Sequence, residues 1–86
     1  MEIDLSRPAR RYLDKRTPAD KAKLAAALDK LAQNPRDPSL DIEPVRGEPG
    51  TFRLKVAEYR VLFTPDAKAG RIAVETIRTR GDVYKR

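Results

Sequence analysis

The stretch TFRLKVAEYRVLF, residues 51–63, decides the fold, because apolar and basic side chains alternate along it in two short segments. The apolar positions are Phe52, Leu54, Val56, Tyr59, Val61 and Phe63, and the basic positions between them are Arg53, Lys55 and Arg60. Alternation is the period of a β-strand, whose successive side chains point to opposite faces. The short connection at Ala57 and Glu58 predicts an antiparallel hairpin of strands 51–57 and 59–63. One face of this hairpin should be apolar and the other cationic.

Two helices are predicted before this hairpin. Residues 2–5 alternate like a short strand, and Ser6 can cap a first helix over 7–15. Thr17 and Pro18 signal the start of a second helix, placed at 19–33, in which leucines recur at helical spacing. These leucines are Leu24, Leu28 and Leu31. The lysines of this helix, Lys21, Lys23 and Lys30, are interpreted as a solvated face.

The remaining residues complete a single small domain. Four of the seven prolines lie between residues 34 and 50, so this stretch is predicted to be an irregular connection. Residues 65–70 read as a turn and 71–77 as a last strand. The chain of 86 residues is therefore expected to form one α+β domain, residues 1–86, with element order βααβββ and a helical hairpin packed on one face of a mostly antiparallel sheet.

Charge and composition narrow the classes of function. From residue 51 onward nine Lys or Arg stand against four Asp or Glu, whereas residues 1–50 hold ten against nine. This local excess of positive charge indicates a polyanionic partner, most plausibly nucleic acid. The chain has no cysteine and no histidine, so catalysis would have to use Lys, Arg, Tyr or a carboxylate, and no cofactor or metal is expected. No signal peptide or membrane span is evident, and a soluble cytoplasmic protein is expected.

Two runs of the sequence resemble a known family. RGEPGTFRLKVAEYRVLF, residues 46–63, and IRTRGDVYKR, residues 77–86, resemble the RelE/ParE superfamily of toxin–antitoxin toxins, and in particular its RelE branch. The resemblance covers nearly the whole chain and implies the RelE-like fold. It also implies a toxin that enters the ribosomal A site and cuts messenger RNA there, with a cognate antitoxin as a further partner. Such toxins need no metal.

The resemblance implies a set of site residues. The catalytic positions of the family fall on Arg53, Lys55, Arg60, Arg80 and Tyr84, and further contacts to the substrate are expected from Arg53, Arg78 and Lys85. Two departures stand out. Arg53 occupies a position that is commonly lysine, and its guanidinium cannot act as a base. Arg78 and Thr79 occupy positions where many relatives have Gly and His or Lys, so a histidine-assisted mechanism is excluded.

The chemistry of such a site can be argued from the residues. In RNA cleavage of this kind a 2′-hydroxyl attacks the adjacent phosphorus, so the site must accept a proton, stabilise the added negative charge and protonate the leaving 5′-oxygen. Lys55 is the natural proton acceptor, since the neighbouring cations Arg53 and Arg60 favour its neutral form. Arg60 and Arg80 can hold phosphate oxygens. Tyr84 can stack on a splayed base.

Other interpretations stay open. By pattern alone, Arg53 and Lys55 would be ordinary solvated residues of an open sheet face, and Tyr59 a core residue. Glu43 is a minor catalytic candidate that a proline-rich loop would more often simply expose. A non-catalytic toxin like the ParE branch, which blocks DNA gyrase, shares the fold, as does a plain RNA-binding module.

Overall fold

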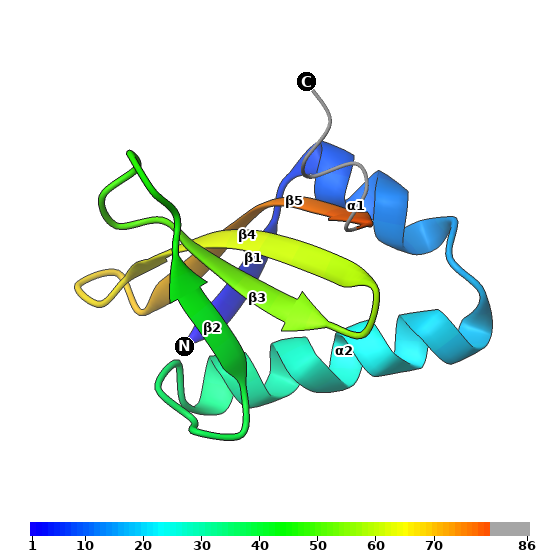
Figure 1. Ribbon diagram of the computed structural model, residues 1–86, viewed down its shortest axis with the longest axis horizontal. Helices are drawn as coiled ribbons and strands as arrows, with labels where there is room; N and C mark the ends of the chain where they lie inside the picture. Colours follow the sequence, from blue (N-terminus) through cyan, green and yellow to red (C-terminus); the bar gives the residue numbers. More distant parts are fainter. Residues whose placement is uncertain (80–86) are drawn as a thin grey trace.

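The computed structural model describes residues 1–79 and confirms the α+β class (Figure 1). Two helices and five strands follow one another along the chain. They are β1 (Glu2–Leu5), α1 (Arg7–Asp14), α2 (Pro18–Gln33), β2 (Asp41–Pro44), β3 (Phe52–Val56), β4 (Tyr59–Asp66) and β5 (Arg71–Thr79).

Both helices begin where their capping residues predict. The hydroxyl of Ser6 accepts a hydrogen bond from the backbone N–H of Ala9 at 3.1 Å, and that of Thr17 accepts one from Asp20 at 3.2 Å. Each side chain thereby satisfies one of the N–H groups that the first turn of a helix leaves unpaired. Asn34 ends α2. In the part of the chain that the structure describes, neither helix has the length and apolar character needed to span a membrane.

The strands form one mixed sheet in the order β1-β5-β4-β3-β2. The pairs β2–β3, β3–β4 and β4–β5 are antiparallel, and the hairpin of β3 and β4 is the one that the sequence predicts. β1 pairs with β5 in parallel, so the first strand and the last described strand lie side by side. A bulge interrupts the β4–β5 register at Leu62 and Phe63.

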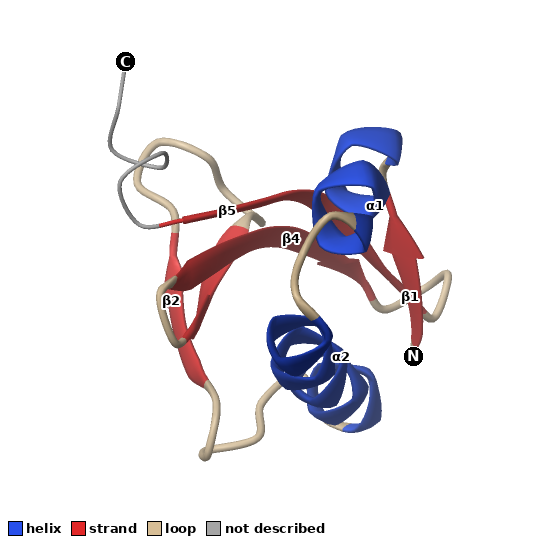
Figure 2. Ribbon diagram, turned by 90° about the vertical axis from the view of Figure 1, so that its right-hand side faces the viewer, coloured by secondary structure: helices blue, strands red, loops and turns tan. Residues whose placement is uncertain are grey.

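Both helices cover the same face of the sheet, and among residues 1–79 no helix covers the other face, called the open face below (Figure 2). The core lies between the helices and the covered face, and its members are apolar residues of α1, α2, β3, β4 and β5. They are Ala9, Leu24, Leu28, Leu31, Leu54, Tyr59, Val61, Phe63, Ile72, Val74 and Ile77. The predicted apolar face of the hairpin is therefore the covered one, and the core assignment of Tyr59 is confirmed.

The prediction of an irregular connection over residues 34–50 was wrong in one segment, where β2 forms an edge strand. Ile42 pairs in register with Leu54 and is half-buried, whereas its neighbours Asp41 and Glu43 are exposed. Pro44 closes the strand, which an edge position tolerates because one side of the strand needs no ladder hydrogen bonds. β2 extends the open face by one strand next to the basic residues of β3.

Candidate functional site

The open face of the sheet carries a row of three basic residues on adjacent strands. In the antiparallel register Lys55 of β3 lies opposite Arg60 of β4, and Arg60 lies opposite Arg78 of β5. Directly opposed residues have Cβ atoms about 4.5–5.5 Å apart, and like charges in such pairs destabilise a sheet. Neutralisation by an anion would remove this repulsion. We call these three residues the cation row.

Arg60 is the buried member of the cation row. Its side chain leaves the residue only 7% exposed, whereas Lys55 and Arg78 are exposed. Its Nη1 donates hydrogen bonds to the carbonyl oxygens of Tyr59 at 2.9 Å and Ala57 at 3.3 Å. The β3–β4 turn therefore fixes the orientation of this guanidinium. A guanidinium has five N–H donors, so donors remain for an anion placed over the row.

Arg53 lies on the same face, two register pairs from Lys55 along β3, but in a different environment. Its guanidinium forms an ion pair with Glu43, its register partner on β2. The side chain of Arg53 is 21% exposed and that of Glu43 is 59% exposed. The carboxylate that sequence analysis kept as a minor catalytic candidate thus lies against one of the predicted site residues.

Beyond Arg53 the open face becomes polar and loses its positive charge. The hydroxyls of Thr51 and Thr64 lie 3.1 Å apart, and Thr64 donates to Oε2 of Glu75 at 2.8 Å. Positive charge is therefore concentrated at the end of the face near the β3–β4 turn. Arg80, Tyr84 and Lys85, the other predicted site residues, lie outside the described residues 1–79.

A second polar cluster ties the helices to the covered face. The hydroxyl of Tyr59 donates to Asp20 of α2 at 2.6 Å, and its ring meets that of Tyr12 edge to face, with centroids 6.2 Å apart. Arg16 lies over the Tyr12 ring at 3.9 Å. The hydrogen bond to Asp20, together with burial, raises the pKa of Tyr59 above its ordinary value. Because the hydroxyl of Tyr59 is hydrogen-bonded to α2, this tyrosine has a structural role.

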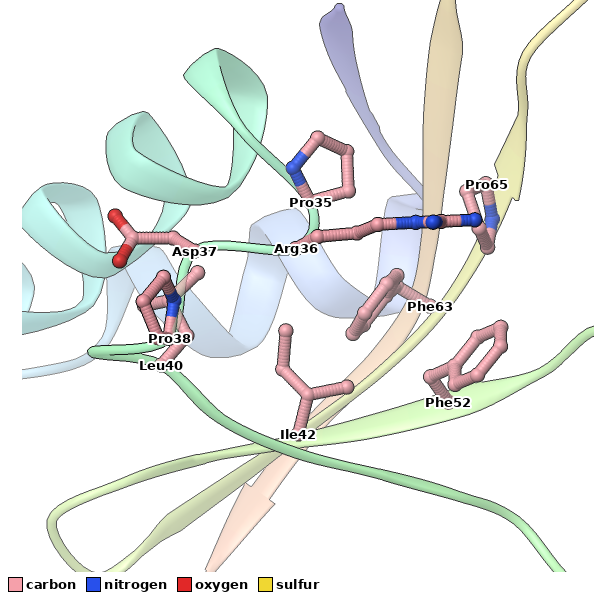
Figure 3. A pocket seen from close by; sticks show the side chains of 9 residues that line it. All are labelled: Pro35, Arg36, Asp37, Pro38, Leu40, Ile42, Phe52, Phe63 and Pro65. Carbon is pink, nitrogen blue, oxygen red and sulfur yellow. The ribbon is translucent and has the colours of Figure 1, made fainter.

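A mainly apolar cavity lies away from the cation row (Figure 3). It has a volume of about 520 Å³ and lies between the α2–β2 connection and the covered face of the sheet. Phe52 and Phe63 stack in its wall with ring centroids 5.8 Å apart. Figure 3 shows the side chain of Arg36 extended across the cavity toward Pro65. The lining is mainly apolar and offers no group suited to phosphate chemistry except this guanidinium.

Sequence analysis missed the relation between the α2 lysines and the sheet. Lys23 and Lys30, which were interpreted as a solvated face, border a smaller groove that Lys55 also lines. Their spacing of seven residues places both on one flank of α2, which is the signal that sequence alone contains. The partner strand β2 was not predicted, so the groove between helix and strand could not be foreseen.

Solved structures share this fold. A chain of the RelE–RelB complex from the archaeon Pyrococcus horikoshii superimposes with a TM-score of 0.80 at 18% identity, over 93% of this chain and 94% of that one. The RelBE2 toxin–antitoxin complex from Mycobacterium tuberculosis gives a TM-score of 0.75 at 26% identity, over 92% and 96%. The isolated RelE toxin from E. coli gives 0.76 at 20% identity, over 96% and 89%. Neither a protein-family model nor a curated protein sequence matches this chain.

The chain has the fold of the RelE toxins, and these neighbours support the RelE-like toxin superfamily that the sequence resembles. The neighbours include RelE in complex with the antitoxin RelB. They match along nearly the full length of this chain.

Proposed function

We propose that this protein is the toxin of a type II toxin–antitoxin system and that it cleaves messenger RNA in the ribosomal A site. The observation that carries the proposal is the cation row, in which Lys55, Arg60 and Arg78 occupy register positions on three adjacent strands of an uncovered face. The similarity to RelE toxins supports it. The protein would work in the cytoplasm, where ribosomes and messages are found.

The proposed reaction is a transesterification within the RNA. The 2′-oxygen forms a bond to the adjacent phosphorus, the bond from phosphorus to the 5′-oxygen breaks, and the products are a 2′,3′-cyclic phosphate and a 5′-hydroxyl. Lys55 takes the proton of the 2′-hydroxyl, and the leaving 5′-oxygen takes a proton from water, which regains one when Lys55 is deprotonated again. Arg60 and Arg78 stabilise the charge that develops on the phosphate oxygens, which is work that a metal ion does in other nucleases.

Electrostatic stabilisation is expected to be the larger effect. Removing one preorganised donor to a transition-state anion typically lowers the rate by about 10²–10³, or roughly 3–4 kcal/mol. Arg60 is preorganised in this sense because two backbone carbonyls fix its guanidinium. Arg80 and Tyr84 stay in the proposal as the second phosphate clamp and the residue that stacks on the base, and Arg53 and Lys85 as further contacts to the RNA.

A cognate antitoxin is the second proposed partner. A cationic face is most simply blocked by a segment of complementary charge, which also suppresses binding to other partners. The chain has a formal net charge of +6, so an acidic antitoxin would be steered toward it. The structures of RelE with RelB provide a precedent for such a complex.

The test is to map the ends of cellular messages by primer extension after brief induction of the protein. Lys55→Ala and Arg78→Ala are the informative variants, because both side chains are exposed and their loss should leave the fold intact. Each substitution is expected to lower the rate of cleavage by a factor of about 10²–10³. Lys68→Ala, in the turn between β4 and β5, removes the same charge from an exposed site away from the row and should cleave like the wild type.

The same cultures separate the proposal from its rival. Plasmid supercoiling is measured alongside, and relaxed or broken DNA with intact messages would overturn the nuclease in favour of a gyrase inhibitor. Purified protein is then added to translating ribosomes and to free message. Cuts that require the ribosome support the proposal, and equal cutting of free message contradicts ribosome dependence.

A further inference from the structure

A groove with three lysines opens at the corner of the sheet where β2 begins and β3 ends. It has a volume of about 380 Å³, within the usual range of ligand sites, roughly 300–1,000 Å³. α2 forms one wall, with Lys23 and Lys30 at its two ends and the small side chains of Ala26 and Ala27 between them. The β2–β3 corner, including Lys55, forms the other wall.

The groove is electropositive. Its lining holds the three lysines, all exposed, against a single carboxylate, Asp41. At its rim Lys30 donates to the Ser39 hydroxyl at 3.5 Å, and Ser39 donates to Asp37 through its N–H at 2.9 Å and its hydroxyl at 2.8 Å. These two hydrogen bonds, with a smaller contribution from Lys30, hold the pKa of Asp37 below its ordinary value. Asp37 is therefore a second carboxylate near the groove, at its rim and not in its lining.

The groove and the cation row share one residue at the corner of the sheet. Lys55 lines the groove and is also the register partner of Arg60. Basic residues therefore follow a path from Arg78 on β5, through Arg60 and Lys55, to the flank of α2, with one carboxylate beside it, that of Asp41, the register partner of Lys55 on β2. A ligand that follows this path needs one negative charge per repeating unit, which is the pattern of a nucleic-acid backbone.

We propose that this groove binds the phosphate backbone of RNA and that Lys23 and Lys30 are its contacts. The ligand is named as RNA because of the proposed function, whereas the site itself follows from the lysines and the groove. The phosphates belong either to the message as it leaves the cation row or to ribosomal RNA beside it. Their chemistry is the same, and the experiment separates the two sources.

The experiment compares two double variants of the full chain. Lys23→Ala with Lys30→Ala removes both groove contacts. Lys15→Ala with Lys21→Ala removes the same charge from exposed positions that do not line the groove. Lys21 is a suitable control because two residues along a helix amount to a rotation of about 200°, so Lys21 and Lys23 lie on different flanks of α2. Alanine favours helix, so neither pair should unfold α2.

Binding is measured by fluorescence anisotropy with a short single-stranded RNA that is 2′-O-methylated and so cannot be cleaved, and by co-sedimentation with ribosomes. Each phosphate contact to a single strand contributes about 0.7 to the salt slope, so loss of two should lower the slope by about 1.4. At about 0.1 M salt this corresponds to roughly 25-fold weaker binding. The control pair should keep the wild-type slope.

The outcomes separate the RNA sources and the alternatives. A loss of affinity for the short RNA supports the groove as a path for the message, and a loss for ribosomes alone supports it as a contact to ribosomal RNA. Unchanged binding in both measurements, or an equal loss in the control pair, would overturn the proposal. It would also be overturned if the groove variant lost affinity only for an acidic antitoxin segment. Because the methylated RNA is not cut, this result stands whether or not the protein proves to be a nuclease.

Discussion

Glu43 illustrates how a single carboxylate can set the strength of a cationic surface. Its carboxylate forms an ion pair with the guanidinium of Arg53 on the open face, next to the cation row. A phosphate that approaches Arg53 must compete with this carboxylate, because both bind the same guanidinium. Under the proposed function, Glu43 would therefore weaken the binding of RNA through Arg53.

Glu43→Gln is expected to strengthen binding of the methylated RNA. Exposed ion pairs are worth up to about 1 kcal/mol, so the gain should be about 2- to 5-fold. Anisotropy titration measures it. Glu48→Gln is the matched control, since Glu48 is exposed in the connection between β2 and β3 and makes no ion pair among the described residues. An equal gain in both variants would show a general effect of net charge and contradict a specific role for Glu43.

Tyr59 connects pH to stability through its hydrogen bond to Asp20. Because its pKa is raised in the folded state, folding favours the protonated hydroxyl. The contribution of this hydrogen bond to the free energy of unfolding is fully present below the ordinary tyrosine pKa of 10.0. It is lost as the pH rises through the higher pKa of the folded state. The bond should therefore stabilise the protein at neutral pH and fail in alkali.

Tyr59→Phe removes the hydroxyl and keeps the ring. Its melting temperature should be lower than that of the wild type at pH 7, and the difference should shrink above about pH 10. Thermal unfolding followed by circular dichroism at several pH values tests this. Tyr12→Phe retains the bond between Tyr59 and Asp20 and should follow the wild-type pH dependence. A constant difference at all pH values would exclude the tyrosine hydroxyl as the cause.

At the scale of elements, the β3–β4 turn has a strained backbone and also positions the side chain of Arg60. Ala57 has a φ of 53°, in the left-handed region that glycine tolerates and alanine does not. Its carbonyl is one of the two acceptors that hold Arg60. The turn thus keeps a costly conformation at the point where it positions the buried cation.

Ala57→Gly should stabilise the protein by up to about 1 kcal/mol, because it relieves the strain while the turn is kept. For a domain of this size that is a rise of about 4–8 °C in melting temperature. Ala67→Gly, in the β4–β5 turn and without positive φ, has no strain to relieve and should lose about 0.4–1 kcal/mol instead. Scanning calorimetry compares the two. A loss in both variants would contradict strain at Ala57.

The elements also show where sequence reasoning succeeds and fails. The alternation of β3 and β4 predicted both strands and the cationic face. It succeeded because the alternating apolar side chains of these strands are the ones that face the core. β2 was missed because the prolines around it indicate irregular structure, although Ile42 between two acidic residues already alternates. The contacts of Arg60 with Ala57 and Tyr59 depend on turn geometry that alternation does not encode. The groove beside α2 depends on β2, so it could not be predicted once β2 had been missed.

At the scale of the whole molecule, the stability of the fold comes from a small core, while the turn strain and the like charges of the open face reduce it. At about 0.05–0.15 kcal/mol per residue, a chain of this length has roughly 4–13 kcal/mol of stability. Leu31 is completely buried between α2 and the sheet. Because so few residues form the core, each one carries a large share of this stability.

Leu31→Ala should cost about 2–5 kcal/mol, through lost burial and the cavity left behind. Urea unfolding should show a lower midpoint with an unchanged slope, since the surface exposed on unfolding stays nearly the same. Gln33→Ala, two residues away and exposed, is the control and should change the midpoint little. A small effect of Leu31→Ala would show that the helix and sheet can close over the missing side chain.

The parallel pairing of β1 with β5 has a consequence for synthesis of the protein. Residues 2–5 find their partners only at 71–74, and the hydroxyl of Ser6 bonds to a carbonyl 69 positions later. Pairings so distant along the chain form late, because the intervening segment must be ordered first. A nascent chain therefore cannot close its sheet until almost all of it has left the exit tunnel. Under the proposed function, this delay would keep the nascent chain inactive while β1 still lacks its partner strand.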